Sequence, residues 1–218
     1  MKLKGLIFDM DGTMFDTEVI SVSAMEHAAE LYGIQLPRET MLGFMGLPGT
    51  EIRRQYLELF GDDFDYSGYR RKKIGYQDAV IDRDGVPVKP GLCALLEFAR
   101  RRGLRCAVAT STNRDRAEDL IRRAGVRAYF DAVICGEDVE QGKPAPDIFC
   151  LAAETLGHAP EACAGIEDSR NGILAARRAG LFTILVPDLI PADDDMLKAA
   201  DLRADSLADV LNFLREME

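Results

Sequence analysis

The sequence predicts an α/β fold: a Rossmann-like, doubly wound parallel sheet with an α-helical domain inserted after its first strand. Short apolar runs alternate with helical patterns from about residue 91 onward, which is typical of parallel strands joined by crossover helices. Between residues 16 and 83, by contrast, the apolar residues recur only at helical spacing. We therefore expect an α/β core of residues 1–15 and 84–218 and a helical insertion of residues 16–83.

The first strand is a short apolar run, residues 6–8, that ends in Asp9 and Asp11 and is followed by Gly12. Two carboxylates at the end of a buried strand are costly, because their repulsion raises one pKa unless a cation lies between them. A divalent metal or a role in phosphoryl transfer would account for the pair. An ordinary Asp-Gly turn that closes the strand would account for it equally well, so this segment alone leaves both interpretations open.

The inserted segment is predicted to be helical throughout. Gly33 and Gly61 mark helix ends, and Thr50 is a candidate N-cap for the helix that carries Ile52. The Pro- and Gly-rich stretch 82–91 then has the composition of a linker back to the core.

The core elements follow in regular alternation. Gly103, Gly125 and Gly180 each stand where a helical pattern stops. The expected elements are helix 91–102, strand 104–109, helix 113–124, strand 130–135, helix 146–156, strand 162–167, helix 170–179, strand 181–186, a short helix 193–199 and a last helix 206–216.

Composition restricts the class of protein. A chain of 218 residues buries a substantial core, and its formal charge of -10 argues against nucleic acid as a partner, which requires a clustered basic surface. No apolar run approaches the length of a membrane span, and the first four residues lead into a strand without a signal-peptide pattern, so we expect a cytoplasmic protein with no membrane contact. The five cysteines are an odd number without a C-x-x-C pair, and we expect reduced core residues.

Polar and charged residues follow several of the expected strands. Ligands of open parallel sheets bind beyond the carboxyl ends of the strands, so these residues are candidates for one shared site. Each has an ordinary alternative role, as a helix cap, as a favourable charge at a helix start, or as a solvated turn lysine. Their joint order along the chain argues against coincidence. The candidates are Asp9 and Asp11, Thr110 and Ser111, Lys143, and Glu167 and Asp168.

Phosphoryl transfer requires this set of groups. Mg²⁺ prefers oxygen ligands such as one or two carboxylates, which Asp9 and Asp168 can supply. Lys143 and the hydroxyl of Thr110 can hold the phosphate oxygens over which charge spreads in the transition state. A carboxylate can then act as the nucleophile and form an aspartyl phosphate.

These residues resemble the four ordered motifs of the haloacid dehalogenase superfamily of phosphatases. The motifs are Asp9-Met10-Asp11-Gly12-Thr13, Thr110, Lys143-Pro144 and Glu167-Asp168-Ser169. The resemblance spans the chain, because the helical insertion is similar to the cap of the subfamily that includes β-phosphoglucomutase and phosphoglycolate phosphatase.

The resemblance implies a Mg²⁺-dependent phosphohydrolase. It implies that Asp9 is the nucleophile and that Asp11 is the general acid/base and a carbonyl ligand of Mg²⁺. Thr110, with Ser111 beside it, and Lys143 would bind the phosphate. Asp168, with Glu167 beside it, would complete the metal ligands. The expected partner is a small phosphorylated metabolite, such as a sugar phosphate, and we expect a monomer or a weak dimer.

Two alternatives stay open. A phosphosugar mutase is disfavoured, because β-phosphoglucomutases have a hinge histidine that residues 16–21 lack, and a cap-loop arginine where this chain has Gly49. A receiver-type signalling module uses similar residues around Mg²⁺, with the phosphorylated aspartate as a switch. Such modules have no helical insertion after the first strand, and a cap that closes over the site suits an enzyme.

Overall fold

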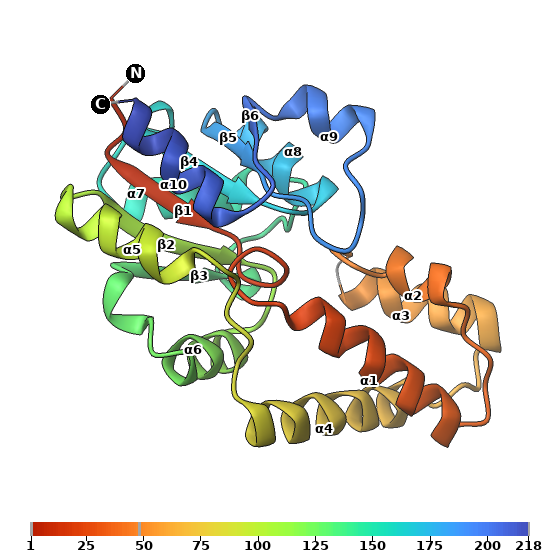
Figure 1. The fold of residues 1–218 in the computed structure, drawn as a ribbon. Coiled ribbons are helices and arrows are strands. Elements are labelled where there is room, and N and C mark those ends of the chain that lie inside the picture. Colours follow the sequence, from red (N-terminus) through yellow and green to blue (C-terminus); the bar gives the residue numbers. More distant parts are fainter. Residues whose placement is uncertain (1, 48, 218) are drawn as a thin grey trace.

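The structure, a computed structural model, describes residues 2–47 and 49–217. Its centre is a six-stranded sheet in the order β3-β2-β1-β4-β5-β6, and every neighbouring pair is parallel (Figure 1). The strands are β1 (Gly5–Phe8), β2 (Arg105–Thr110), β3 (Ala132–Cys135), β4 (Cys163–Glu167), β5 (Phe182–Leu185) and β6 (Leu202–Arg203). β1 lies in the middle of the sheet, so the residues that follow it come out at the centre of one sheet edge.

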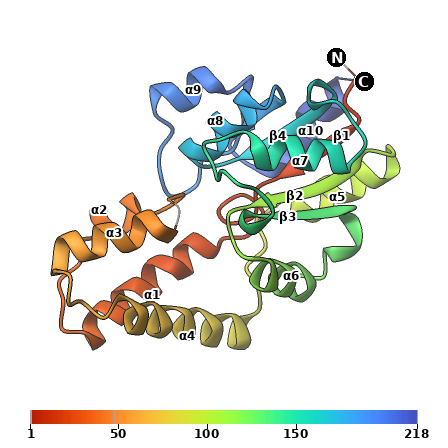
Figure 2. The ribbon, with the colours of Figure 1, turned by 180° about the vertical axis from the view of Figure 1, so that it is seen from behind.

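Helices cover both faces of the sheet. Side chains alternate across a strand, so Phe8 packs in the hydrophobic cluster under α5, α6 and α10, whereas Ile7 packs against α7 and α8 on the opposite face (Figures 1 and 2). The α-helices of the core are α5 (Leu92–Arg101), α6 (Arg114–Arg123), α7 (Asp147–Thr155), α8 (Arg170–Arg178), α9 (Asp194–Ala199) and α10 (Leu207–Glu216). Short 3₁₀ turns, η1 (Arg127–Tyr129), η2 (Gly136–Asp138) and η3 (Pro160–Ala162), connect some of them. The predicted α/β fold is therefore confirmed.

In the part of the chain that the structure describes, four α-helices lie between β1 and α5 and have a core of their own. They are α1 (Thr17–Leu31), α2 (Arg38–Gly43), α3 (Gly49–Phe60) and α4 (Tyr66–Asp84). Their hydrophobic cluster is rich in aromatic rings, and the hydroxyl of its buried Tyr56 donates to that of Tyr69 at 2.9 Å. α1 packs along α4, and we call α1 to α4 the helical insertion (Figure 1).

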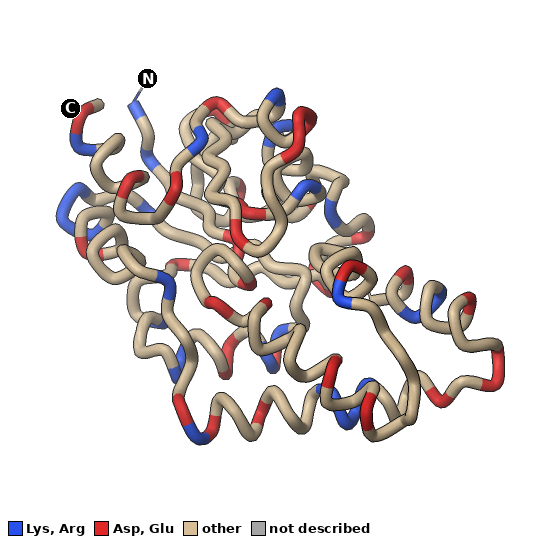
Figure 3. The backbone as a smooth tube through the Cα atoms, turned by 45° about the vertical axis from the view of Figure 1, so that its right-hand side comes forward, with Lys and Arg blue, Asp and Glu red and all other residues tan. Residues whose placement is uncertain are grey.

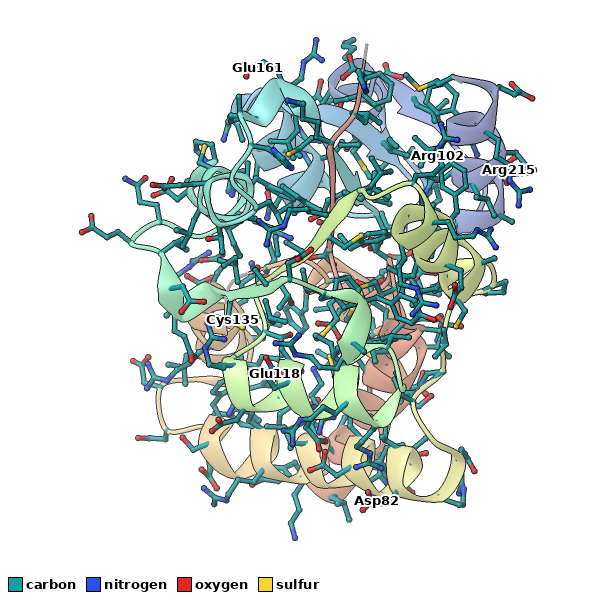
Figure 4. All side chains as sticks on the ribbon, turned by 90° about the vertical axis from the view of Figure 1, so that its left-hand side faces the viewer. Asp82, Arg102, Glu118, Cys135, Glu161 and Arg215 are labelled. Atoms are coloured by element: carbon teal, nitrogen blue, oxygen red, sulfur yellow. The ribbon has the colours of Figure 1, made fainter. Side chains whose placement is uncertain are left out.

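Ion pairs join the insertion to the core along α4 and α6. Arg116 of α6 pairs with Asp78 of α4, and Arg123 pairs with Asp82 at 2.8 Å. Figure 4 shows the two helices side by side, with Asp82 near the end of α4 and Glu118 on α6. These contacts hold one edge of the insertion over the carboxyl ends of the strands.

Most predicted elements agree with the structure within one or two residues, but three details differ. The short strand β6 was not expected, because its two residues give no apolar run. Thr50 lies inside α3, so its prediction as an N-cap is wrong. All five cysteines are free, yet Cys93 is exposed and Cys150 half-buried, so only the other three are core residues. None of the helices within 2–47 and 49–217 is both long and apolar enough to cross a membrane.

Candidate active site

The ends of the central strands bring the candidate residues together. Thr110 is the last residue of β2 and Glu167 the last residue of β4, and both strands flank β1. Asp9 directly follows β1, and its backbone N–H donates to the carbonyl of Ile166 at 2.9 Å, which continues the pairing with β4. All three side chains are buried, with exposed fractions of 8 % for Asp9, 1 % for Thr110 and 0 % for Glu167. The predicted convergence at one sheet edge is therefore present.

A tight turn after Asp9 brings this loop against Asp168. Gly12 has a φ of +85°, and a Cβ atom there would lie 2.4 Å from Oδ2 of Asp168, so only glycine fits. The hydroxyl of the next residue, Thr13, donates to Oδ1 of Asp168 at 2.7 Å. The Gly-Thr pair of the first motif thus fixes a carboxylate that lies 155 positions away in the chain.

Lys143 is the cation of the cluster. Its buried Nζ donates to Oδ1 of Asp9 at 2.5 Å, to Oε1 of Glu167 at 2.6 Å and to the carbonyl of Ala109 at 3.0 Å. A lysine ammonium has three donors, so all of them are used in this arrangement. Lys143 is therefore no solvated turn lysine, and it connects the ends of β1, β2 and β4.

Glu167 is fully engaged on its other oxygen as well. Oε2 accepts from the backbone N–H of Asp168 and of Ser169, each at 3.1 Å, and from the Ser169 hydroxyl at 3.0 Å. The side chain lies against Gly172 of α8, where a Cβ atom would come within 1.8 Å of Oε1. Gly172 was not anticipated from the sequence, because only the close approach of Glu167 explains the need for glycine.

The charges of this cluster do not balance. Among the residues described in the structure, Lys143 is the one cation that contacts Asp9 and Glu167, and the remaining donors to these two and to Asp168 are neutral. Burial raises the pKa of Asp9 well above its usual value, and Glu167 adds to the effect while Lys143 opposes it. Burial, followed by Glu167 and Asp9, likewise raises the pKa of Asp168. Burial alone would lower the pKa of Lys143, but the two acids beside it outweigh burial and raise it.

The donor set fits a hard divalent cation. Carboxylate oxygens of Asp9, Glu167 and Asp168 lie within 4.8 Å of one another. In the described part of the chain, Oδ2 of Asp9 and Oδ2 of Asp168 accept no hydrogen bond, whereas both oxygens of Glu167 do. Two free carboxylate oxygens and an excess of negative charge are what Mg²⁺ requires of a protein site.

Asp11 lies beside this cluster and connects it to the insertion. Its Oδ1 accepts from the hydroxyl of Thr17 at 2.6 Å, and its Oδ2 accepts from the hydroxyl of Thr112 at 2.7 Å. Thr17 is the first residue of α1, and Thr112 follows β2. The position of Asp11 therefore depends on both parts of the molecule, and the role of Thr17 was not foreseen from the sequence.

A cleft of about 880 Å³ opens between the sheet edge and the insertion. From the core, Asp9, Asp11, Thr110, Ser111 and Lys143 line it, and Ser111 is exposed to it. The insertion contributes apolar, aromatic and charged side chains of both signs, among them Phe44, Tyr56, Glu18, Arg70 and Lys73.

All seven residues proposed for the site thus lie at one sheet edge, but they differ in placement. Glu167 and Asp168 are buried behind the surface of the cleft, with exposed fractions of 0 % and 5 %. Thr110 has its hydroxyl oxygen within 3.1 Å of the backbone N–H of Thr112, which donates to it. Two residues close to the site have the ordinary role of helix caps: the side chain of Asn113 caps α6, and that of Ser169 caps α8.

Known proteins with similar sequences and structures share this architecture. The profile of the haloacid dehalogenase-like hydrolase family matches residues 6–186. A phosphorylated carbohydrates phosphatase of Thermotoga maritima is 31% identical over 221 residues, which cover 99% of this chain and 100% of the relative. The fructose-1-phosphate phosphatase YqaB of Escherichia coli is 37% identical over 180 residues, 83% of this chain and 94% of the relative.

Among solved structures, CbbY from Rhodobacter sphaeroides in complex with phosphate superposes with a TM-score of 0.81 at 29% identity, over 95% of this chain and 96% of that one. The family match, the relatives and the structural likeness all extend over both the sheet and the insertion. The chain therefore belongs to the haloacid dehalogenase-like hydrolase family.

Proposed function

We propose that this protein is a Mg²⁺-dependent phosphatase that hydrolyses a small phosphorylated metabolite, such as a sugar phosphate, through an aspartyl phosphate on Asp9. The observation that carries the proposal is the buried cluster at the sheet edge, where Asp9 and Lys143 face a cleft of metabolite size and Asp168 lies behind them with a free carboxylate oxygen. The names of the two phosphatase relatives agree with this chemistry.

In this proposal Asp9, Asp168 and the backbone carbonyl of Asp11 would hold Mg²⁺, which would supply positive charge to the phosphate and to the attacking carboxylate. Glu167, whose two oxygens are occupied by hydrogen bonds, positions Lys143 and the loop that carries Asp168. Its role as a direct metal ligand, expected from the sequence, is therefore not part of the proposal.

The first step transfers the phosphoryl group to the protein. The Asp9 carboxylate attacks phosphorus, the bond between phosphorus and the ester oxygen breaks, and Asp11 donates a proton to the leaving oxygen. Lys143 and the hydroxyls of Thr110 and Ser111 hold the other phosphate oxygens. The buried setting raises the pKa of Asp9, so the ammonium of Lys143 beside it is needed to keep the nucleophile ionised.

The second step restores the enzyme. A water molecule attacks the phosphorus of the aspartyl phosphate, Asp11 accepts its proton, and Asp9 is released together with inorganic phosphate. Because Thr17 of the insertion binds Asp11, movement of α1 would change the position of this acid/base. We therefore propose that residues 16–83 act as a cap on a core of residues 1–15 and 84–218.

The test is phosphate release from a panel of sugar phosphates, with Mg²⁺ and with EDTA. The proposal predicts release that requires Mg²⁺ and that ends when Asp9 is replaced by asparagine. Calcium should not replace Mg²⁺, since its longer and looser coordination misplaces the carboxylate. Undiminished hydrolysis in EDTA would overturn the metal assignment.

A phosphosugar mutase remains the second candidate, and the same assay separates the two. A mutase returns its phosphate to the sugar, so β-glucose 1-phosphate would give glucose 6-phosphate without free phosphate. We expect free phosphate or no reaction, because Gly49 lines the cleft without offering a charge for a second phosphate. The expected cytoplasmic location and the monomeric or weakly dimeric state stay predictions.

A further inference from the structure

We infer that Asn171 is a positioning residue that holds one turn of the insertion in place along the wall of the cleft. The turn consists of residues 44–47, between α2 and α3, and we call it the cleft turn. The side-chain amide of Asn171, on α8 of the core, donates to the carbonyl of Gly46 at 3.1 Å. The inference rests on the proposed function, since the cleft turn would face the leaving group of that reaction.

The cleft turn lines the cleft, whereas Asn171 lies outside that lining. All four residues of the turn belong to the lining, and so does Ser169 of the core. Asn171, the second residue of α8, is not among the lining residues that the structure describes. Any effect of Asn171 on the reaction therefore passes through Gly46.

The conformation of Gly46 allows the close approach of the two parts. The backbone N–H of Leu47 donates to the carbonyl of Phe44 at 3.3 Å, and Gly46, third in this turn, has a φ of +69°. A Cβ atom at position 46 would lie 3.2 Å from Cβ of Ser169, which is closer than ordinary van der Waals contact. Another residue there would be strained and would push the cleft turn away from α8.

On the core side, the contact is made by a fixed element. The hydroxyl of Ser169 accepts from the backbone N–H of Gly172 at 3.1 Å and donates to Oε2 of Glu167 at 3.0 Å. The first turn of α8, which carries Asn171, is thereby attached to the buried cluster. Asn171 thus connects the cleft turn to the segment that contains Asp168.

No charge takes part in this contact. Acidic and basic residues are distributed over the helices of both parts (Figure 3), but residues 41–50 contain none. The edge formed by α4 and α6 is held by ion pairs, whereas α2 and α3 lie on the side of α8 and α9 (Figures 1 and 2).

Few contacts fix the cleft turn to the core. Among the described residues, Asn171 makes the one hydrogen bond between residues 38–60 and the core. Leu189, which follows β5, adds an apolar contact with the hydrophobic cluster of the insertion. Because apolar contacts are not directional, the amide of Asn171 is the group that sets the position of Gly46.

Loss of the Asn171 amide should affect the leaving group and not the phosphoryl group. Asp9, Lys143 and Asp168 keep their own hydrogen bonds, because none of these involves Asn171. A neutral hydrogen bond changes an equilibrium by about 3- to 10-fold. We therefore expect kcat/KM for a sugar phosphate to fall by about 3- to 10-fold, chiefly through KM.

The kinetic experiment compares a sugar phosphate that the protein hydrolyses with acetyl phosphate, whose leaving group is much smaller. Asn171→Ala removes the amide. Asn171→Asp keeps its size but replaces the donor by an acceptor, and a carboxylate in the first turn favours the helix, so α8 is not weakened. Both variants should show the fall for the sugar phosphate and stay within about 2-fold for acetyl phosphate. Asn171→Gln keeps an amide donor and should recover part of the loss.

Hydrogen–deuterium exchange measures how firmly the cleft turn is held, and it requires no turnover. Peptides that cover residues 44–47 should exchange about 3-fold or more faster in Asn171→Asp. Gly46→Ala should have the same effect, and Gly46→Ala/Asn171→Ala should lose little more than either single variant, because both changes break one contact. Gly33→Ala is the matched control: Gly33 also has a positive φ, +61°, but nothing lies within 4 Å of a Cβ atom there, so the cleft turn should be unaffected.

Equal losses for the sugar phosphate and acetyl phosphate would overturn the inference, because Asn171 would then act through the loop that carries Asp168. Unchanged exchange of the cleft turn in Asn171→Asp would also overturn it. Failure of the proposed function is a separate result. If the unaltered protein hydrolysed no phosphomonoester with Mg²⁺, the phosphatase would be overturned, and exchange would still decide whether Asn171 holds the cleft turn.

Discussion

Replacement of Lys143 by methionine is the most informative perturbation of the buried cluster. Methionine has a similar length and no charge, so the change removes the cation and leaves the surrounding acids in place. Three acceptors lose their donor: Oδ1 of Asp9, Oε1 of Glu167 and the carbonyl of Ala109. The exposed fractions of 8 % for Asp9 and 0 % for Glu167 mean that water cannot readily take its place.

The expected loss of stability follows from this geometry. Removal of one partner from a buried ion pair typically costs about 3–5 kcal/mol, because the remaining charge is left unpaired. For a chain of this size about 1 kcal/mol corresponds to about 2–4 °C in the melting temperature, so we expect a decrease of about 10 °C in EDTA. Mg²⁺ should recover part of the decrease, since it supplies the missing positive charge to Asp9 and Asp168.

The assay is thermal unfolding with EDTA and with Mg²⁺, and Lys89→Met is the matched control. Lys89 also contacts two acids, Asp16 and Asp188, but its side chain is 19% exposed. Lys89→Met should therefore lower the melting temperature clearly less than Lys143→Met does. If Lys143→Met melted within about 2 °C of the unaltered protein in EDTA, the cluster would not need its cation, and our description of its electrostatics would be wrong.

Three further changes test separate parts of the account. Asp11→Asn should lower the hydrolysis of sugar phosphates by about 10²–10⁴ and that of p-nitrophenyl phosphate much less, because a phenolate leaves without a proton; equal losses would contradict the acid role. Asp168→Asn should abolish the increase in melting temperature that Mg²⁺ gives, and a retained increase would place the metal elsewhere. Glu18, a buried residue of α1, lines the cleft, and burial, then Asp188, raises its pKa from 4.5 to about 8. The folded protein therefore loses stability as pH rises through this window. Glu18→Gln should therefore stabilise the protein in EDTA at pH 8, by on the order of 2 kcal/mol, and change little at pH 4; parallel pH profiles would refute this.

The sheet and its edge could be predicted because local patterns determine them. Apolar runs and glycine stops identify the strands and helices, and the parallel order then places Asp9, Thr110 and Glu167 at one edge. The two-residue strand β6 has no such pattern, and it forms only because β5 offers it an edge.

The interior contacts of the site could not be predicted in the same way. Glycine is needed at position 172 because Glu167 of β4 lies against it, and Thr17 acts through its hydrogen bond to Asp11 on the preceding loop. Neither residue therefore has a local signature in the sequence. In the basic run Arg70-Arg71-Lys72-Lys73 of α4, only Arg70 and Lys73 line the cleft. Tertiary packing decides which face of this helix is turned to the cleft. Sequence spacing shows that Arg70 and Lys73 share a face, but it does not show where that face points.

The most direct test of the central claim is a search for phosphate on Asp9. The protein is mixed with Mg²⁺ and an intact sugar phosphate that it is known to hydrolyse. The reaction is quenched in acid, and the peptides of the protein are analysed by mass spectrometry. The account predicts one added phosphoryl group on the peptide that contains Asp9, labile to hydroxylamine and absent from Asp9→Asn. Full turnover by Asp9→Asn, or a phosphoryl group on another residue, would contradict it.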